Sequence, residues 1–176
     1  DAIRYVVRDC SMGQVLIARS RQGVCAIFLG DDPDVLASRL KDRFPHAMPV
    51  NGHADMDETA ARVVRFIEHP GQGLDVPLDM RGTDFQRRVW DTLLRIPAGR
   101  TASYTDVAAQ IGSPGAVRAV AGACASNLIA VAIPCHRVVR RDGALSGYRW
   151  GTHHKQELLA REAAAAMHAA AAVGTR

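Results

Sequence analysis

The chain has 176 residues, of which 48% are hydrophobic, so it is long enough for one or two small domains with a substantial core. No apolar run approaches the roughly 18 residues that a membrane span needs, and no signal peptide is recognisable, so we expect a cytoplasmic protein with no membrane partner. Residues 1–80 carry nine Lys or Arg and twelve Asp or Glu, whereas residues 81–176 carry thirteen and six. The basic second half favours a polyanionic partner, although a solvated surface can show the same counts.

The first half alternates strand-like and helix-like segments. Residues 4–9, 14–18 and 23–29 are rich in β-branched side chains, and turn residues separate them, which predicts a meander of antiparallel strands. Residues 34–44 and 57–68 have helical spacing of apolar side chains, with a loop predicted at 45–53. Residues 70–82 contain the Pro and Gly typical of a connector. The pattern predicts an α/β N-terminal domain, with its connector, over residues 1–80.

Helices dominate residues 81–176, which we expect to form a mostly α-helical C-terminal domain. One helix is predicted at 84–95 after a capping Thr83, and another at 105–111 after Ser103, which has capping-box spacing to Asp106. A glycine-containing turn leads to a helix at 116–126. Residues 105–126 therefore have the outline of a helix-turn-helix, which an ordinary helical hairpin shares. A last helix is predicted at 152–165, and the alanine-rich tail is expected to fray.

The helix at 116–126 has few side chains that could read DNA bases. Arg118 is its only long polar side chain, and most of the others are small or aliphatic. A sequence-specific recognition helix normally presents several long polar groups to base edges. Small residues let a helix approach a narrow groove closely, and one arginine can enter a base stack. The composition indicates DNA binding by shape and charge or, alternatively, an alanine-rich core helix.

The strongest candidate for chemistry is the sequence IPCHRV at residues 133–138. Cys135 directly precedes His136, and a neighbouring imidazole or cation can lower the pKa of a thiol and so favour the reactive thiolate. The apolar residues 128–133 predict a buried strand that ends near this cysteine. Side chains diverge at consecutive strand positions, so a turn or a bridging water is needed between the two groups. The alternative is a buried structural cysteine beside a surface histidine.

The four cysteines indicate neither a metal site nor a disulfide framework. Cys10, Cys25, Cys124 and Cys135 include no C-x-x-C pair and no zinc-like spacing with histidine, so we expect no metal and no cofactor. Two disulfides are a weaker alternative, and a reducing, intracellular setting is the simpler interpretation. A start at Asp1 rather than Met is compatible with a place in a longer fusion protein.

Together these motifs resemble the O6-alkylguanine-DNA alkyltransferases. The resemblance covers about residues 3–163 and rests on PCHR at 134–137, SY at 103–104, AVRAV at 116–120, Asn127 and Glu162. RGTDFQ at 81–86, LSGYRWG at 145–151 and GDD at 30–32 are similar to the repair half of the bacterial adaptive-response proteins. The resemblance implies an RNase H-like fold for the N-terminal domain and a DNA-binding helix-turn-helix in the C-terminal domain.

The resemblance also implies a suicide repair reaction by a monomer on double-stranded DNA. The damaged nucleotide flips out of the duplex, and the alkyl group of O6-alkylguanine, or of O4-alkylthymine, moves irreversibly to Cys135. His136 would take the thiol proton through a water, and Glu162 would orient His136, as in a catalytic triad. Tyr104 would help to rotate the nucleotide, and Arg118 would fill the gap in the stack.

The same resemblance implies roles for further residues. Asn127 would join the parts of the active site through backbone hydrogen bonds. The implied substrate pocket comprises Ser146, Tyr148, Val138 and Trp90, and the implied DNA-binding surface comprises Arg118, Tyr104, Ala116, Ala119, Gly122 and Arg137. The chain departs from many relatives in having Leu128 rather than proline after Asn127. It also lacks the zinc-binding regulatory half of the adaptive-response proteins.

Two other classes of protein remain as alternatives. A cysteine hydrolase that uses Cys135, His136 and Glu162 would turn over repeatedly and would need an oxyanion hole, for which no motif is apparent. A pure helix-turn-helix DNA binder would need base-reading side chains on the helix at 116–126, and these are missing.

Overall fold

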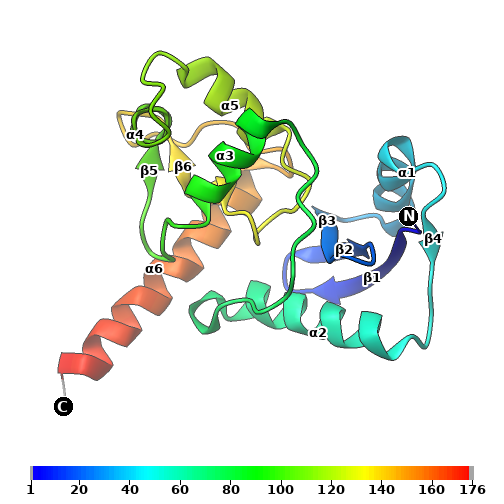
Figure 1. Ribbon diagram of the computed structural model, residues 1–176. Helices are drawn as coiled ribbons and strands as arrows, with labels where there is room; N and C mark the ends of the chain where they lie inside the picture. Colours follow the sequence, from blue (N-terminus) through cyan, green and yellow to red (C-terminus); the bar gives the residue numbers. More distant parts are fainter. Residues whose placement is uncertain (1, 175–176) are drawn as a thin grey trace.

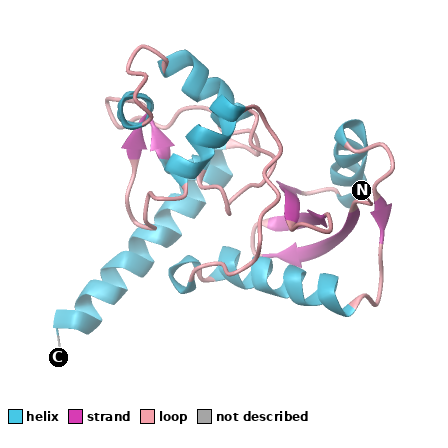
Figure 2. Ribbon diagram, viewed as in Figure 1, coloured by secondary structure: helices cyan, strands magenta, loops and turns pink. Residues whose placement is uncertain are grey.

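The computed structural model describes residues 2–174 of the chain. It is a mixed α/β structure in which a sheet with two helices lies beside a mainly helical second half (Figure 1). A long connector without regular structure over most of its length joins the two halves, as the loop colouring of Figure 2 shows. No helix within the described range is long and apolar enough to cross a membrane.

Four strands form the N-terminal sheet in the order β3-β2-β1-β4. The strands β1 (Arg4–Cys10), β2 (Gly13–Arg19) and β3 (Val24–Gly30) are antiparallel neighbours, which confirms the predicted meander. Gly13 has a φ of 107° in the β1–β2 turn, a conformation that glycine adopts without steric cost. The strand β4 (Met48–Pro49) pairs in parallel with β1 and was not predicted, because two residues are too few to show an alternating pattern.

Two helices and a 3₁₀ turn complete the first half. The helix α1 (Pro33–Arg43), capped by Asp32, packs on β2 and β3, whereas α2 (Ala54–Glu68) packs on β1 and β2. Residues 15–18 of β2 are completely buried, so both faces of the sheet are covered there. The short η1 (Pro70–Gln72) then turns the chain into the connector.

The second half contains a group of short helices and one long helix. The helices α3 (Asp84–Leu93), α4 (Tyr104–Gln110) and α5 (Val117–Ala125) pack on one another, and α6 (Thr152–Gly174) extends away from them (Figure 1). Full capping boxes start α3 and α4; the sequence predicted the box at Ser103 and, at Thr83, a cap. Between these elements lie β5 (Ala102–Ser103), which pairs in parallel with β6 (Val138–Val139), and the 3₁₀ turn η2 (Cys135–Arg137).

Backbone hydrogen bonds to the edge of β3 join the two halves. Ile27 N–H donates to the carbonyl of Leu128 at 2.9 Å, and Ala130 N–H donates back to the carbonyl of Ile27 at 3.0 Å. The connector pairs with the same edge at Val24, which bonds to Pro77 and Asp79 at 2.9 and 2.8 Å. An otherwise open strand edge is thereby covered, and the segment before Cys135 is fixed to the N-terminal sheet.

Two predictions about local structure were wrong. Residues 128–133 form turns with one bridge at Ile129 instead of a strand, and Val131 has a φ of 69°. The segment is apolar because it is buried between the halves, and a short buried run does not distinguish a strand from other buried structure. The tail does not fray at residue 165, since α6 continues to Gly174. Alanine has the highest helix propensity, which accounts for this extension.

Candidate active site

Cys135 lines a hollow of about 660 Å³ in the second half of the chain. The other walls come from the start of α4, from the outer side of α5 and from residues 145–149, which precede α6. The volume lies within the range of roughly 300–1,000 Å³ that is typical of small-molecule sites. The lining of a hollow of about 770 Å³ between β1 and α2 includes no cysteine or serine, so the thiol chemistry points to the hollow at Cys135.

Asn127 shapes the backbone around Cys135. Its side-chain amide donates to the carbonyl of Ile133 at 2.9 Å and to the sulfur of Cys135 at 3.3 Å. Its carbonyl oxygen accepts from the backbone N–H of Ile129 at 2.8 Å. Asn127 has no exposed surface, so every one of these polar contacts is made inside the protein. One buried side chain therefore closes residues 127–135 into a compact turn and also contacts the sulfur.

The Cys135 thiol is neutral at rest. Burial raises its pKa above the ordinary value, while the hydrogen bond from Asn127 and the charge of Lys155 oppose this. Burial raises the pKa of the neighbouring Cys124 to about 12. The charge of Arg149 also lowers the pKa of Cys135, but it does not outweigh burial. A base is therefore needed to form the thiolate at neutral pH.

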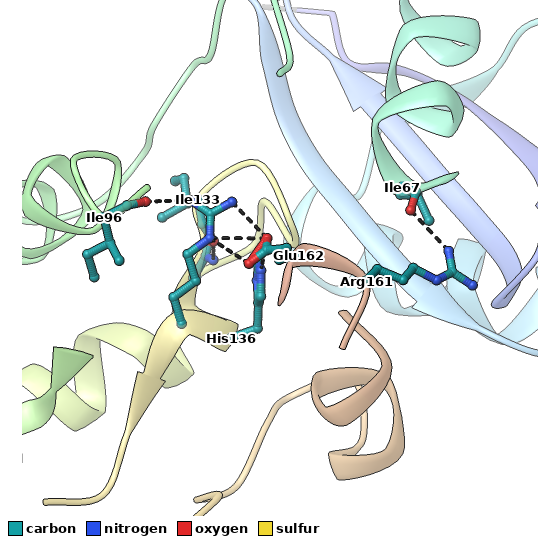
Figure 3. Close-up of polar contacts among 8 residues, drawn as sticks. Ile67, Ile96, Ile133, His136, Arg161 and Glu162 are labelled. Carbon is teal, nitrogen blue, oxygen red and sulfur yellow. Dashed lines mark hydrogen bonds and ion pairs between the residues drawn. The ribbon is translucent and has the colours of Figure 1, made fainter. Parts of the chain in front are cut away.

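Glu162 on α6 binds the two residues that follow Cys135. His136 Nε2 donates to Glu162 Oε2 at 2.9 Å (Figure 3). Arg137 donates to the same carboxylate through Nε and Nη2, each at 2.8 Å. All three side chains are buried. Burial alone would raise the pKa of Glu162, but the hydrogen bonds and charges of His136 and Arg137 outweigh it and lower that pKa. The carboxylate is therefore ionised and paired at neutral pH.

His136 has the protonation state of a base. Burial lowers its pKa, and the hydrogen bond to Glu162 only partly opposes this, so the ring is neutral at pH 7. With its proton on Nε2, Nδ1 carries a lone pair. Nδ1 is buried and has no hydrogen-bond partner among residues 2–174. The η2 turn (Cys135–Arg137) supplies the change of direction that the Cys-His pair requires.

Lys155 is a buried cation that the sequence analysis missed. It has no exposed surface, and its ammonium donates to the carbonyl of Val138 at 2.7 Å and to Ser146 Oγ at 3.1 Å. Burial lowers its pKa, while the nearby Cys135 and Cys124 raise it. Lysine is almost never fully buried unless it is paired, which makes this one a strong functional candidate. Its one signal in the sequence is a place on the same face of the last helix as Glu162, seven residues earlier.

Tyr104 and Tyr148 both line the pocket. Tyr104 begins α4, and its hydroxyl shares a short hydrogen bond with Ser146 Oγ, so Val138, Lys155, Ser146 and Tyr104 form one continuous chain of hydrogen bonds. The hydroxyl of Tyr148 is buried and has no partner within the described residues. Burial raises the pKa of both phenols, so both remain neutral donors.

The outer side of α5 carries mostly small side chains, and it borders the Cys135 pocket. Val120, Ala123 and Cys124 face the core, whereas Arg118, Ala119 and Gly122 are exposed. Ala116 precedes the helix and is partly exposed. Ala121, Cys124 and Ala125, on the same helix, line the pocket with Cys135. Arg118 is thus the one long side chain on this exposed surface of small residues, and the surface lies next to the pocket that contains Cys135.

The structure corrects three predicted site residues. Arg137 is buried against Glu162 and the carbonyl of Ile96, so it is a structural cation and not a DNA contact. Trp90 lies behind α5, where its indole N–H donates to the carbonyl of Ala123 at 2.9 Å. Val138 is buried in β6, and its carbonyl binds Lys155. Neither Trp90 nor Val138 lines the pocket, while Ser146 and Tyr148 do.

Comparison with known proteins agrees with this geometry. The family model described as "6-O-methylguanine DNA methyltransferase, DNA binding domain" matches residues 84–164. The chain is 49% identical to the bifunctional transcriptional activator/DNA repair enzyme Ada of Escherichia coli, over 92% of this chain and 46% of that protein. It is 38% identical to the inducible methylated-DNA–protein-cysteine methyltransferase of Bacillus subtilis, over 81% of this chain and 80% of that protein. The chain spans about half the length of the first relatives that it matches.

The fold has a close counterpart among solved structures. The crystal structure of the Mycobacterium tuberculosis O6-methylguanine methyltransferase superimposes with a TM-score of 0.76 at 36% identity, covering 92% of this chain and 93% of that one. The structure of Mycobacterium tuberculosis OGT in complex with DNA gives a TM-score of 0.76 at 35% identity, covering 94% of each chain. The identities to relatives and the shared fold lead to one conclusion: the chain belongs to the methylated-DNA–protein-cysteine methyltransferase family.

Proposed function

We propose that the chain repairs O6-alkylguanine, and also O4-alkylthymine, in double-stranded DNA by moving the alkyl group to Cys135. The observation that carries the proposal is the position of Cys135 in a pocket, with its sulfur hydrogen-bonded to Asn127 and the His136–Glu162 pair at the adjacent residue of the same turn. The reaction forms a carbon–sulfur bond and breaks the carbon–oxygen bond at O6. The thiol proton is released and the guanine regains one, so the products are unmodified guanine and a thioether.

The proton path follows from the protonation states. His136 Nδ1 accepts the thiol proton through one water and becomes an imidazolium. The ionised Glu162 at Nε2 stabilises that cation, as the third member of a catalytic triad does. Arg137 keeps Glu162 ionised. Because the resting thiol is neutral, this relay forms the thiolate only as the reaction requires it.

Lys155 stabilises the thiolate and the pocket wall. Its ammonium is coupled to the charge of Cys135, so it lowers the cost of a buried anion at the sulfur. Through Ser146 it also fixes the hydroxyl of Tyr104. Tyr104, as a neutral phenol, can then donate to the purine as negative charge leaves along the carbon–oxygen bond.

The DNA-binding part of the proposal concerns α4 and α5 as a helix-turn-helix. Its support is the basic charge of residues 81–176 and the smooth outer side of α5. Such a helix approaches a groove closely and binds with little sequence preference. Ala116, Ala119 and Gly122 would contact the DNA backbone, and Arg118 would fill the space that the flipped nucleotide leaves.

The proposal also assigns roles to the two halves. Residues 81–176 act as the DNA-binding and transfer domain, and residues 1–80, as an RNase H-like α/β domain with its connector, hold the loop before Cys135 through β3. The protein acts as a monomer in the cytoplasm. Water cannot hydrolyse a thioether under these conditions, so each molecule reacts once.

The test is to mix the protein with duplex DNA that contains one O6-methylguanine and to analyse the peptides by mass spectrometry. The expected result is one added methylene mass on the peptide with Cys135, and no more than one methyl removed per molecule. Cys135→Ala should abolish transfer while DNA binding remains. Several methyl groups removed per molecule would support a hydrolase instead.

A further inference from the structure

A second hollow, of about 970 Å³, lies where the two halves of the chain meet. Four arginines line it: Arg39 and Arg43 from α1, Arg81 from the connector, and Arg149 from the loop before α6. Arg81 is paired with Asp79 at 2.9 Å, so we name the other three, Arg39, Arg43 and Arg149, the arginine cluster. Asp42 is the sole carboxylate among the described residues of the lining. Guanidinium groups that gather in a hollow favour binding of phosphate, because their planar donors fit its oxygens.

The cluster keeps its positive charge available to a ligand. Arg39, Arg43 and Arg149 are exposed, and within residues 2–174 no carboxylate lies at ion-pair distance from them. Arg43 lies 5.1 Å from the centre of the Phe44 ring, which orients its guanidinium. Cations in the last turn of α1 also complement the helix dipole. That effect does not account for Arg39, one turn earlier, or for Arg149 on another element.

The hollow adjoins the candidate active site. Arg149 lines both hollows, and its Nη1 donates to the carbonyl of Ala125 at 3.1 Å. Ala125 lines the Cys135 pocket, while the next residue, Ser126, lines the arginine hollow. The end of α5 is therefore a shared rim. A strand that leaves the pocket across this rim meets Arg149 first and α1 next.

We infer that the arginine cluster binds phosphates of the DNA strand that flanks the flipped nucleotide, on one side of the lesion. This inference rests on the proposed function, since it uses the same DNA. It gives the N-terminal half, which is acidic overall, a direct part in holding the duplex. The partner is the sugar–phosphate backbone, so the contact adds affinity without sequence preference.

The test measures DNA affinity in the Cys135→Ala protein, so that transfer chemistry plays no part. Arg39→Gln/Arg43→Gln removes two contacts, and each phosphate contact on duplex DNA contributes about 0.9 to the slope of log K against log salt. Between 50 and 200 mM salt, the wild-type affinity should therefore fall about tenfold more than that of the variant. The control is Arg62→Gln/Arg65→Gln on α2, which removes the same charge from outside this hollow. Thermal unfolding verifies that both variants fold.

A second measurement locates the contact. Two duplexes are used, each shortened on a different side of the lesion. The Arg39→Gln/Arg43→Gln variant should bind one of them as tightly as the wild type does, because that duplex lacks the contacted phosphates. It should bind the other more weakly than the wild type does. An affinity and salt slope equal to wild type overturns the inference. So does a deficit equal to that of the α2 control, since it would reflect net charge alone. Failure of the proposed function would show separately, as wild-type protein that gains no methyl group on Cys135.

Discussion

Glu162→Gln is the most informative single change, because it removes one charge from a buried cluster and keeps its shape. Glu162 is 1% exposed and accepts hydrogen bonds from His136 and Arg137. The substitution leaves Arg137 as a buried cation without a counter-ion. Breaking a buried pair in this way costs about 3–5 kcal/mol. For a chain of this size each kcal/mol lowers Tm by about 2–4 °C, so Tm should fall by roughly 10 °C.

The same helix offers a matched control. Glu157 pairs with Arg161 at 3.0 Å, but its side chain is 54% exposed, and pairs of this kind contribute about 0.3–0.5 kcal/mol. Glu157→Gln should therefore change Tm by no more than about 2 °C. Thermal unfolding at pH 7, followed by circular dichroism, compares the two variants. Similar melting of both would refute the assignment of Glu162 as the counter-ion of Arg137.

Two further measurements separate charge from shape. Arg137→Met in the Glu162→Gln background should restore part of the lost stability, because no buried cation then remains unpaired. The pKa of Glu162 is lowered by folding, so its contribution is complete above the ordinary carboxyl pKa of about 4.3 and is lost as pH falls below it. The difference in stability between wild type and Glu162→Gln should thus shrink in acid. A difference that stays constant down to pH 3 would contradict this.

Three other changes test the site. His136→Ala should slow alkyl transfer at pH 7, because the buried thiol must then ionise without a base. The transfer rate of this variant should rise about tenfold per pH unit in alkali. A pH–rate profile like that of wild type would show that His136 does not accept the thiol proton. Lys155→Met should raise the pKa of Cys135, which is measured by the pH dependence of thiol alkylation. It should also slow the reaction with the free O6-methylguanine base as much as the reaction with DNA. An unchanged pH dependence of alkylation would show that Lys155 has only a structural role. Arg118→Ala should impair repair of duplex DNA far more than reaction with the free base, which needs no flipping, and equal losses on both substrates would indicate a structural role.

Local patterns predicted most of the secondary structure. Runs of β-branched residues between turns gave the three main strands, and the caps at Thr83 and Ser103 gave the starts of α3 and α4. These signals act between residues close in sequence, so they are visible without the fold. Residues 128–133 were different, because their conformation is set by burial against β3 and by the hydrogen bonds of Asn127.

The site was only partly visible in the sequence. The Cys135-His136 pair stood out by its chemistry, whereas Glu162 followed from resemblance to a family. Arg137 was assigned to DNA because it is basic and near the cysteine, yet it is buried against Glu162. Lys155 was overlooked because lysine is normally exposed. Neither burial nor pairing of a charged residue can be read from its type.

The sequence by itself determined the candidate nucleophile, the three main strands, the helices and the small side chains of α5, because each depends on residue type and short-range spacing. Only the tertiary structure decided that the thiol is neutral at rest, that Lys155 and Glu162 point inward from α6, and that β3 holds the loop before Cys135. Those properties depend on desolvation and on contacts between residues far apart in the chain. Such contacts form only when the whole chain has folded.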